Sequence, residues 1–319
     1  MNVPRETLKG SPSERHQMPS SRVALWWHTI RPATLWAGAA PVCVGAGIST
    51  QIGITWSFET FMIFTVSVLG SLLIQIGCNL VNDFSDFEKG TDDDHRLGPA
   101  RAAAQGWLSA MELKRAAILC LALAGVCGIY LTWIGGWPIL ALGLASLLCA
   151  VAYTAGPFPL AYLGLGDLFV LLFFGLGAVV GTTWLLCASL TPPEAWWSGG
   201  AVGALATAIL VVNNLRDREG DQRHDKRTLA VRFGARFARL EYTVLVGSAL
   251  LISLGLALTT GDWGWGTPLL ITPLAVQRIR QVWRTDGAAL NPLLGATAQL
   301  ELLFCLCLTL GLCLERWMG

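Results

Sequence analysis

The sequence predicts an all-α polytopic membrane protein, a bundle of nine transmembrane helices. The chain is 54% hydrophobic and 13% charged, with a mean hydropathy of +0.55, which is too apolar for a soluble domain of its length. Nine windows of roughly twenty apolar residues are each long enough to cross about 30 Å of hydrocarbon. These windows lack the period-two alternation of β-barrel strands, so the backbone must satisfy its hydrogen bonds within helices.

The expected helices follow one another along the chain, with boundaries accurate to about four residues. Most of the 14 tryptophans fall near the predicted helix ends, as an interfacial belt would place them. The nine windows are residues 34–53, 60–82, 113–133, 137–154, 165–187, 195–214, 240–260, 264–281 and 293–314.

The chain before the first window is polar and contains three prolines, Pro4, Pro12 and Pro19. We expect residues 1–30 to form a disordered cytosolic arm and residues 31–319 to form one transmembrane domain. Of the 22 Lys and Arg residues, 21 lie in four regions, and the exception is Arg316 near the C-terminus. If nine helices alternate in direction, these four regions lie on the same side of the membrane. The positive-inside rule then predicts a cytoplasmic N-terminus and a C-terminus on the opposite side of a prokaryotic inner or plasma membrane.

An acidic cluster follows the second window, in the stretch "NLVNDFSDFEKGTDDDHRLGPAR" of residues 79–101. If this helix continues past the membrane surface, Asn79, Asn82, Asp83 and Asp86 occupy positions i, i+3, i+4 and i+7, which share one face. The stretch "NNLRDREGD" ends the sixth window in the same way. Its Asn213, Asp217 and Asp221 are spaced at i, i+4 and i+8.

Even-numbered helices end on the same side, so the two clusters are expected to face each other. Like charges at the rim of an apolar bundle repel one another and resist desolvation, so a cation is expected between them. Carboxylate and amide oxygens suit Mg²⁺, which completes its coordination with water and substrate phosphate. Basic side chains matched to phosphate oxygens accompany both clusters, namely Lys89, Arg96, Arg101, Arg216 and Lys226.

A solvated loop is the competing interpretation of these charges. We favour it for Glu88, Asp93, Asp94 and Glu219, which lack the helical spacing. For Asp83, Asp86, Asp217 and Asp221 the spacing recurs at two membrane exits. This repetition favours a metal and diphosphate site.

A third stretch, "YTAGPFPLAYLGLGD" at residues 153–167, predicts a tight connection held against the bundle. Asp167 either caps the following helix or takes part in catalysis. Tyr153 and Tyr162 either face a cavity or anchor at the interface. Arg31, beside the start of the first window, either binds an anion or only follows the positive-inside rule. The residues leave these alternatives open.

The chain resembles the UbiA superfamily of intramembrane prenyltransferases, and within it the branch that prenylates 1,4-dihydroxy-2-naphthoate. The resemblance rests on four blocks in family order, covering residues 31 to about 234: "RPATLWAGAAPV", "NLVNDFSDFEKGTD" with "RLGPAR", "YTAGPFPLAYLGLGD" with "FFG", and "NNLRDREGDQRHDKRTLAVRFG". It implies nine helices around a central cavity under a cytosolic cap. One departure is Gly90, where the 4-hydroxybenzoate branch has Asp. The next acid is Asp92, which favours the naphthoate branch.

By the same resemblance, Asn82, Asp83, Asp86 and Asp92 match the first Asp-rich motif, and Asp217 and Asp221 match the second. These residues would hold Mg²⁺ on an isoprenyl diphosphate. Basic residues would match positions near the phosphates, namely Lys89, Arg96, Arg101 and Lys226. Arg31, Tyr153 and Asp167 are candidates for orienting the acceptor or taking protons.

The implied reaction transfers a polyprenyl or phytyl group to dihydroxynaphthoate with loss of CO₂, in menaquinone or phylloquinone synthesis. The expected partners are the isoprenyl diphosphate, the aromatic acceptor and the lipid bilayer, with no nucleic acid, while the oligomeric state stays open. One alternative is a homogentisate, 4-hydroxybenzoate, haem-O or chlorophyll prenyltransferase. The other is a cation transporter, which would carry acid near the bilayer midplane, where Glu301 is the chief acidic residue.

Overall fold

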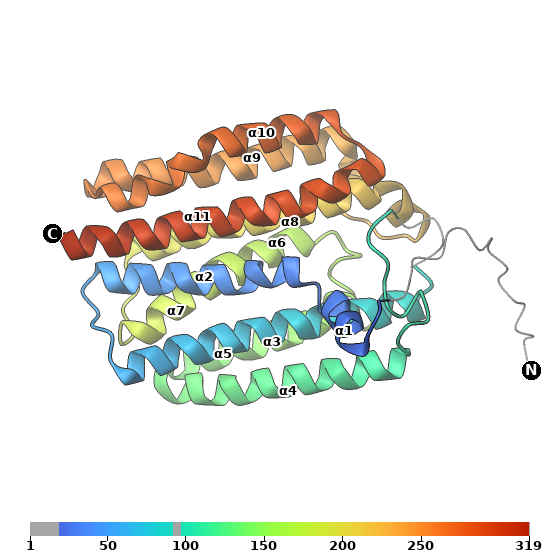
Figure 1. The fold of residues 1–319 in the computed structure, drawn as a ribbon, viewed down its shortest axis with the longest axis horizontal. Coiled ribbons are helices and arrows are strands. Elements are labelled where there is room, and N and C mark those ends of the chain that lie inside the picture. The colour runs from blue at the N-terminus through green and yellow to red at the C-terminus, as the bar shows by residue number, and fades with distance from the viewer. Residues whose placement is uncertain (1–18, 92–96, 319) are drawn as a thin grey trace, which may run out of the picture.

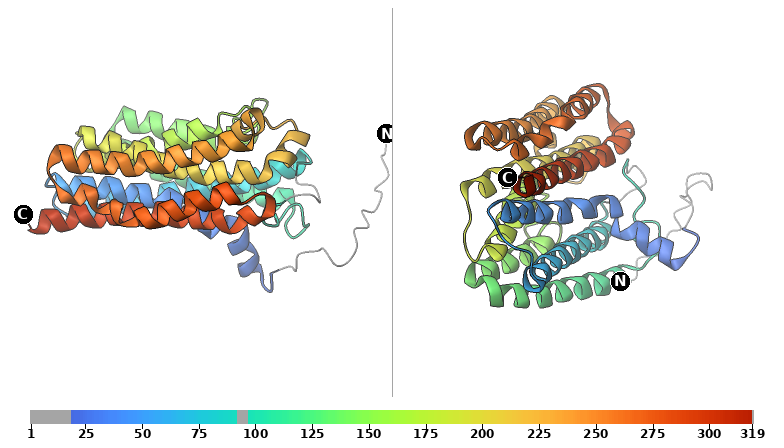
Figure 2. Two further views of the ribbon diagram at one scale, coloured as in Figure 1. Left: turned by 90° about the horizontal axis from the view of Figure 1, so that it is seen from above. Right: turned by 60° about the vertical axis from the view of Figure 1, so that its left-hand side comes forward.

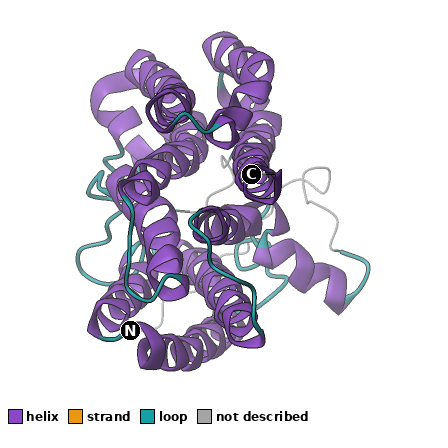
Figure 3. Cartoon of the chain, turned by 90° about the vertical axis from the view of Figure 1, so that its left-hand side faces the viewer, coloured by secondary structure: helices purple, strands orange, loops and turns teal. Residues whose placement is uncertain are grey.

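The computed structural model describes residues 19–91 and 97–318, and within these ranges the chain is helical with no strand (Figure 3). The helices lie roughly side by side along the long axis of the molecule (Figure 1). Their bounds are α1 Arg22–Ile30, α2 Pro32–Gln51, α3 Phe58–Glu88, α4 Ala110–Gly135, α5 Trp137–Ala152, α6 Gly166–Val170, the π-helix η1 Leu171–Gly177, α7 Ala178–Leu186, α8 Pro193–Arg223, α9 Leu229–Thr260, the 3₁₀-helix η2 Trp263–Ile271, α10 Thr272–Arg284, the 3₁₀-helix η3 Gly287–Leu290 and α11 Asn291–Met318.

Every predicted window is helical, but the count of nine membrane spans is not confirmed. In the described chain, 7 helical stretches are long and apolar enough to cross a membrane. The remaining two windows contain α5, which has only 16 residues, and α10, which carries Arg278, Arg280 and Arg284. Large apolar side chains such as Ile118, Leu148 and Leu251 point outward and are at least 60% exposed, as lipid-facing residues would be. These are features of an integral membrane protein.

Local sequence signals explain where the long helices begin. Ser57 and Thr60 form a capping box at the start of α3, and Ser109 and Glu112 form another at the start of α4. Each box satisfies backbone N–H groups that the first helical turn leaves unpaired. Both α3 and α8 have 31 residues, so they extend beyond the roughly twenty needed to cross the bilayer. Their ends can therefore carry the polar clusters outside the apolar layer.

The core lies where α2, α8, α9 and α11 pack together, and it includes the fully buried Ile48, Val202, Val246 and Leu300. η1 packs unusually close to α8. A Cβ atom on Gly175 would lie 2.3 Å from the carbonyl oxygen of Gly199. Glycine at this point therefore allows the two backbones to approach closely.

Three features share one end of the bundle: α1, the end of α3 and the end of α8 (Figure 1, Figure 2). The C-terminus lies at the other end. A cavity of about 1490 Å³ is lined mainly by α2, α3, α4, α5, η1 and α7, and its lining reaches Asn82 and Asp86 of α3. The central cavity that the resemblance implies is present, and its lining includes part of the first acidic cluster.

Candidate active site

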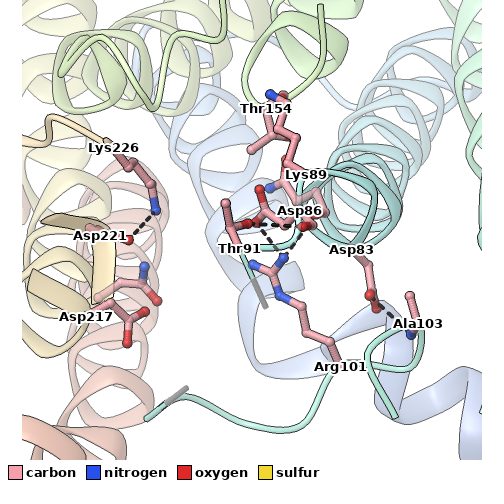
Figure 4. Close-up of polar contacts among 12 residues, drawn as sticks. Asp83, Asp86, Lys89, Thr91, Arg101, Ala103, Thr154, Asp217, Asp221 and Lys226 are labelled. Carbon is pink, nitrogen blue, oxygen red and sulfur yellow. Dashed lines mark hydrogen bonds and ion pairs between the residues drawn. The ribbon is translucent and has the colours of Figure 1, made fainter. Parts of the chain in front are cut away.

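The two acidic clusters meet at one end of the bundle, as predicted. A second cavity, of about 290 Å³, is lined by Asp86 of α3 and by Asn213, Asp217 and Asp221 of α8. The three α8 residues therefore share a face, which confirms the interpretation of their spacing. Figure 4 shows the α8 carboxylates and Asp86 on opposite sides of this region.

Asp86 is the centre of the polar contacts on α3. Arg101, from the connection between α3 and α4, donates from Nη1 to Oδ2 of Asp86 at 2.5 Å and to the carbonyl oxygen of Asn82 at 3.0 Å. The hydroxyl of Tyr162 donates to Oδ1 of Asp86 at 3.1 Å. The side chains of Arg101 and Asp86 are only 10% and 9% exposed. Two connections far apart in sequence thus converge on one carboxylate, and Figure 4 shows the contact made by Arg101.

Arg216 joins the residues of the second cluster. Its guanidinium binds Asp217 in bidentate fashion, with Nε 2.8 Å from Oδ1 and Nη2 2.5 Å from Oδ2. Nη2 also donates to Oδ1 of Asn213 at 2.8 Å, and Nη1 donates to Oδ1 of Asn291 at 3.0 Å. Because the Arg216 side chain is 2% exposed, these contacts must offset the cost of burying its charge.

Lys226 pairs with Asp221, with 3.1 Å between Nζ and Oδ1. The other carboxylate oxygen of Asp221, Oδ2, is buried and has no hydrogen-bond partner among the described residues. A buried acceptor of this kind is costly unless a cation or donor reaches it. Asp86, Asp217 and Asp221 therefore each stand beside a basic side chain, and Asp221 retains an oxygen suited to a metal ligand.

The donor set suits Mg²⁺ that binds together with phosphate. Within residues 19–91 and 97–318, no three His, Cys, Asp or Glu side chains are close enough together to hold one metal ion. Mg²⁺ is usually held by one or two carboxylates, with waters and substrate phosphates completing its octahedron. Carboxylates on facing helices, each accompanied by a cation, fit that mode of binding better than an all-protein cage.

Asp83 lines the large cavity together with Asn79, Asn82 and Asp86, which confirms the predicted common face of α3, but its carboxylate binds elsewhere. Its carboxylate points away from Asp86 and accepts hydrogen bonds from the backbone N–H groups of Ala102 and Ala103, at 3.3 and 3.4 Å (Figure 4). The side chain is buried, and it does not line the smaller cavity. The Asp83 carboxylate therefore faces the loop after Arg101 and does not face α8.

Lys89 also contacts the protein itself. Its ammonium donates to the carbonyl oxygen of Thr154 and lies 4.5 Å from the ring centroid of Tyr162. Burial lowers the pKa of Lys89, and the nearby Asp86 opposes this change. Lys89 thereby ties the end of α3 to the connection between α5 and α6. The predicted Asp92 and Arg96 lie outside the described residues.

Of the three candidates for acceptor chemistry, Arg31 and Tyr153 line the large cavity and Asp167 does not. Burial, and then the charge of Asp167, raise the pKa of the Tyr153 hydroxyl, so this group stays protonated and can donate a hydrogen bond. Asp167 lies in the first turn of α6 and makes no capping bond, because the N-cap position is occupied by Leu165. Its Oδ1 is buried without a partner among the described residues.

The backbone of Arg31 is strained. It separates α1 from α2 with φ 55° and ψ 70°, in the left-handed region that non-glycine residues seldom occupy. The following Pro32 further restricts this residue towards extended conformations. Strain of this kind is retained where surrounding structure demands it, often at ligand sites.

Comparison with known proteins decides the family. The sequence profile of the UbiA prenyltransferase family matches residues 38–308. The chain belongs to the UbiA prenyltransferase family. The 1,4-dihydroxy-2-naphthoate octaprenyltransferase of Escherichia coli K12 is 36% identical over 306 residues, covering 93% of this chain and 97% of the relative. The protein of the same name from Haemophilus influenzae is 33% identical, over 93% and 98% of the two chains.

The UbiA fold is also recognised in solved structures. A UbiA homologue from Archaeoglobus fulgidus, bound to GPP and Mg²⁺, superposes with a TM-score of 0.63 at 17% identity. The match covers 90% of this chain and 99% of the homologue. Membership of the UbiA family makes this chain a prenyl-transferring enzyme.

Two site residues of this UbiA enzyme escaped sequence analysis. Thr154 donates to Oδ1 of Asn82 at 2.7 Å. Asn291, at the start of α11, accepts from Arg216 and donates to the carbonyl oxygen of Leu97 at 2.7 Å. It thus links the second cluster to the connection that carries Arg101. No spacing pattern marks Asn291, because its partners lie 75 and 194 residues away in sequence.

Proposed function

We propose that this UbiA enzyme transfers an isoprenyl group from its diphosphate to 1,4-dihydroxy-2-naphthoate, with loss of CO₂, in menaquinone or phylloquinone biosynthesis. The observation that carries the proposal is the meeting of two cavities at Asp86, which lines both. One cavity is small and polar and suits a diphosphate, and the other is large and suits an apolar tail. The names of the Escherichia coli and Haemophilus influenzae relatives support the acceptor.

In this proposal Asp86, Asp217 and Asp221 hold Mg²⁺ against the diphosphate, together with Asp92. The metal supplies positive charge that stabilises the departing diphosphate. Phosphate oxygens are bound by basic and amide side chains, namely Asn82, Lys89, Arg96, Arg101, Arg216 and Lys226. Each described carboxylate of this set already stands beside one of these cations, so metal ligands and phosphate donors lie close together. Asp83, predicted as a ligand, contributes by holding the loop beside Arg101.

The proposed reaction depends on basic side chains beside the diphosphate and on a cavity that excludes water. The allylic C–O bond breaks with its electron pair leaving on the diphosphate, whose charge is stabilised by the guanidinium of Arg101 and the ammonium of Lys226. The cavity walls exclude water from the allylic cation. The electron-rich ring carbon then forms the new C–C bond, and the carboxylate at that carbon leaves as CO₂, which restores aromaticity. Arg31 and Tyr153 orient the acceptor, and Asp167, whose charge acts on the Tyr153 hydroxyl, is the candidate for taking a proton.

We further propose that residues 31–319 form one domain of nine membrane spans under a cytosolic cap made by the connections near Asp86. The N-terminal arm is then cytoplasmic, and the C-terminus lies on the opposite side. The placement of α1 and the C-terminus at opposite ends supports this topology (Figure 1). Disorder was predicted for residues 1–30, and residues 1–18 of this arm lie outside the described part of the chain.

The test uses membranes containing the full chain, Mg²⁺, a labelled isoprenyl diphosphate and a panel of aromatic acceptors, with products identified by mass. We expect a prenylated product from dihydroxynaphthoate that lacks the carboxyl group. No product should form when a chelator replaces Mg²⁺. A product from homogentisate or 4-hydroxybenzoate alone would refute the proposed acceptor.

A further inference from the structure

One polar side chain in the wall of the large cavity has no protein partner. Gln75 of α3 lines this cavity and is only 9% exposed. Its side-chain amide makes no hydrogen bond to any described residue. An amide that is removed from water without a partner is costly, so the expected complement is a polar group on a molecule that enters the cavity.

The other polar side chains with which α3 lines the cavity already have hydrogen-bond partners. Ser71 donates to the carbonyl oxygen of Gly38 at 2.6 Å. Asn79 donates from Nδ2 to the carbonyl oxygen of Ile30 at 3.1 Å and to Oγ1 of Thr34 at 3.0 Å. Partners are also present for Ser67, Asn82, Asp83 and Asp86. These side chains serve the fold or the diphosphate site, which leaves the amide of Gln75 for another ligand.

The depth of Gln75 suits the far side of an aromatic acceptor. Gln75 is eleven residues before Asp86, or about 17 Å along α3. It is four residues, or about 6 Å, deeper than Asn79, whose amide binds the α1–α2 junction at Arg31. An acceptor that reacts at a carbon about 3.5 Å from the donor, on the side nearer Asp86, extends past Asn79 towards Gln75.

Gln75 and Arg31 both lie beside α2. A Cβ atom on Gly38 of α2 would lie 3.6 Å from Cβ of Gln75, and Arg31 immediately precedes the first residue of the same helix. Arg31, which also lines the cavity, is the proposed partner of the acceptor. One aromatic molecule can therefore contact the two residues at its opposite sides.

We propose that Gln75 binds the 4-hydroxyl group of dihydroxynaphthoate, the hydroxyl farther from the carboxylate. This inference rests on the proposed function, since it takes dihydroxynaphthoate as the acceptor. The hydroxyl donates to Oε1 of Gln75, and Nε2 can donate to the hydroxyl oxygen. Gln75 thereby selects acceptors with two hydroxyl groups across the ring from each other, because an acceptor without the 4-hydroxyl leaves the buried amide unpaired.

The experiment measures acceptor preference in membranes that contain the full chain. The KM for dihydroxynaphthoate is compared with the inhibition constant, Ki, of 1-hydroxy-2-naphthoate, which lacks only the 4-hydroxyl. The test variant is Gln75→Met, which keeps an unbranched side chain of similar length without the amide. The matched control is Ser71→Ala, one turn away on α3, because the Ser71 hydroxyl is already bound to Gly38.

We expect Gln75→Met to raise the KM for dihydroxynaphthoate at least tenfold. The Ki of 1-hydroxy-2-naphthoate should stay within twofold or fall, because methionine leaves no amide unpaired. Inhibition that is detectable only in Gln75→Met would be the same change in preference. The KM for the isoprenyl diphosphate should stay within twofold. Ser71→Ala should leave the ratio of Ki to KM unchanged.

Two results would overturn the inference. One is an unchanged KM for dihydroxynaphthoate in Gln75→Met. The other is a rise of KM and Ki by the same factor, because that would show a general effect on the cavity and no recognition of the 4-hydroxyl. Turnover by the unaltered enzyme tests the proposed function separately: if dihydroxynaphthoate is not prenylated at all, the proposed function itself fails.

Discussion

Arg101 donates a hydrogen bond from Nη1 to Oδ2 of Asp86 at 2.5 Å, and both side chains are nearly buried. Removing the cation leaves the buried Asp86 carboxylate with the Tyr162 hydrogen bond but without its ion pair, and it deletes a donor for phosphate. We therefore expect Arg101→Ala to lower kcat/KM at least hundredfold, about 2.7 kcal/mol. The control is Arg22→Ala, whose pair with Glu112 is exposed and should matter less than twofold. Equal, small effects in the two variants would contradict this role.

Arg216 uses the planar fork of its guanidinium, which lysine cannot reproduce. In Arg216→Lys the bidentate contact to Asp217 and the contacts to Asn213 and Asn291 cannot all be kept. We expect at least a tenfold fall in kcat and a lower melting temperature of the detergent-solubilised protein. Arg218→Lys is the control, because its contact to Glu219 is long and exposed. Normal kcat in Arg216→Lys would show that charge alone suffices.

Asp83 binds the loop that follows Arg101, so the effect of substituting Asp83 on the kinetics should depend on whether Arg101 is present. We expect Asp83→Asn to raise the KM for isoprenyl diphosphate about fivefold while the Mg²⁺ concentration for half-maximal rate stays within twofold. In an Arg101→Ala background the substitution should add almost nothing, because the interaction energy of a double-mutant cycle reports coupling. A tenfold rise in the Mg²⁺ requirement, as expected for Asp86→Asn, would instead make Asp83 a metal ligand.

The Tyr153 hydroxyl has a raised pKa, so it is protonated at neutral pH and remains so as the pH rises towards the usual tyrosine value near 10. We expect Tyr153→Phe to raise the KM for the acceptor about tenfold, by the same factor at pH 7 and at pH 9. If the ratio of the two KM values became smaller between pH 7 and pH 9, the Tyr153 hydroxyl would be losing its proton in this range. That result would contradict the raised pKa that burial produces.

The architecture was largely predictable because membrane helices carry a strong apolar signal. All nine windows are helical, and the spacing of Asn213, Asp217 and Asp221 correctly placed them on one face. The spacing on α3 also held, because Asn79, Asn82, Asp83 and Asp86 all line the large cavity. The spacing did not predict that backbone N–H groups of the loop after Arg101 would bind the Asp83 carboxylate. A helical wheel does not include such a loop.

Contacts between distant connections could not be predicted. Tyr162 reaches Asp86 across 76 residues, and Asn291 reaches Leu97 across 194. These contacts depend on how the connections fold over the bundle end, which hydrophobic periodicity does not encode. The cationic partners of Asp86 and Asp217 were recognisable as basic residues near the clusters, but their pairing was not.

The central claim, that facing carboxylates on α3 and α8 hold a metal-bound diphosphate between them, is tested most directly by binding. The measurement is equilibrium binding of an unreactive isoprenyl thiolodiphosphate across a Mg²⁺ titration, for the unaltered enzyme, Asp86→Asn and Asp217→Asn. We predict Mg²⁺-dependent binding that each substitution weakens at least hundredfold. Binding without Mg²⁺, or unchanged binding in either variant, would contradict the claim.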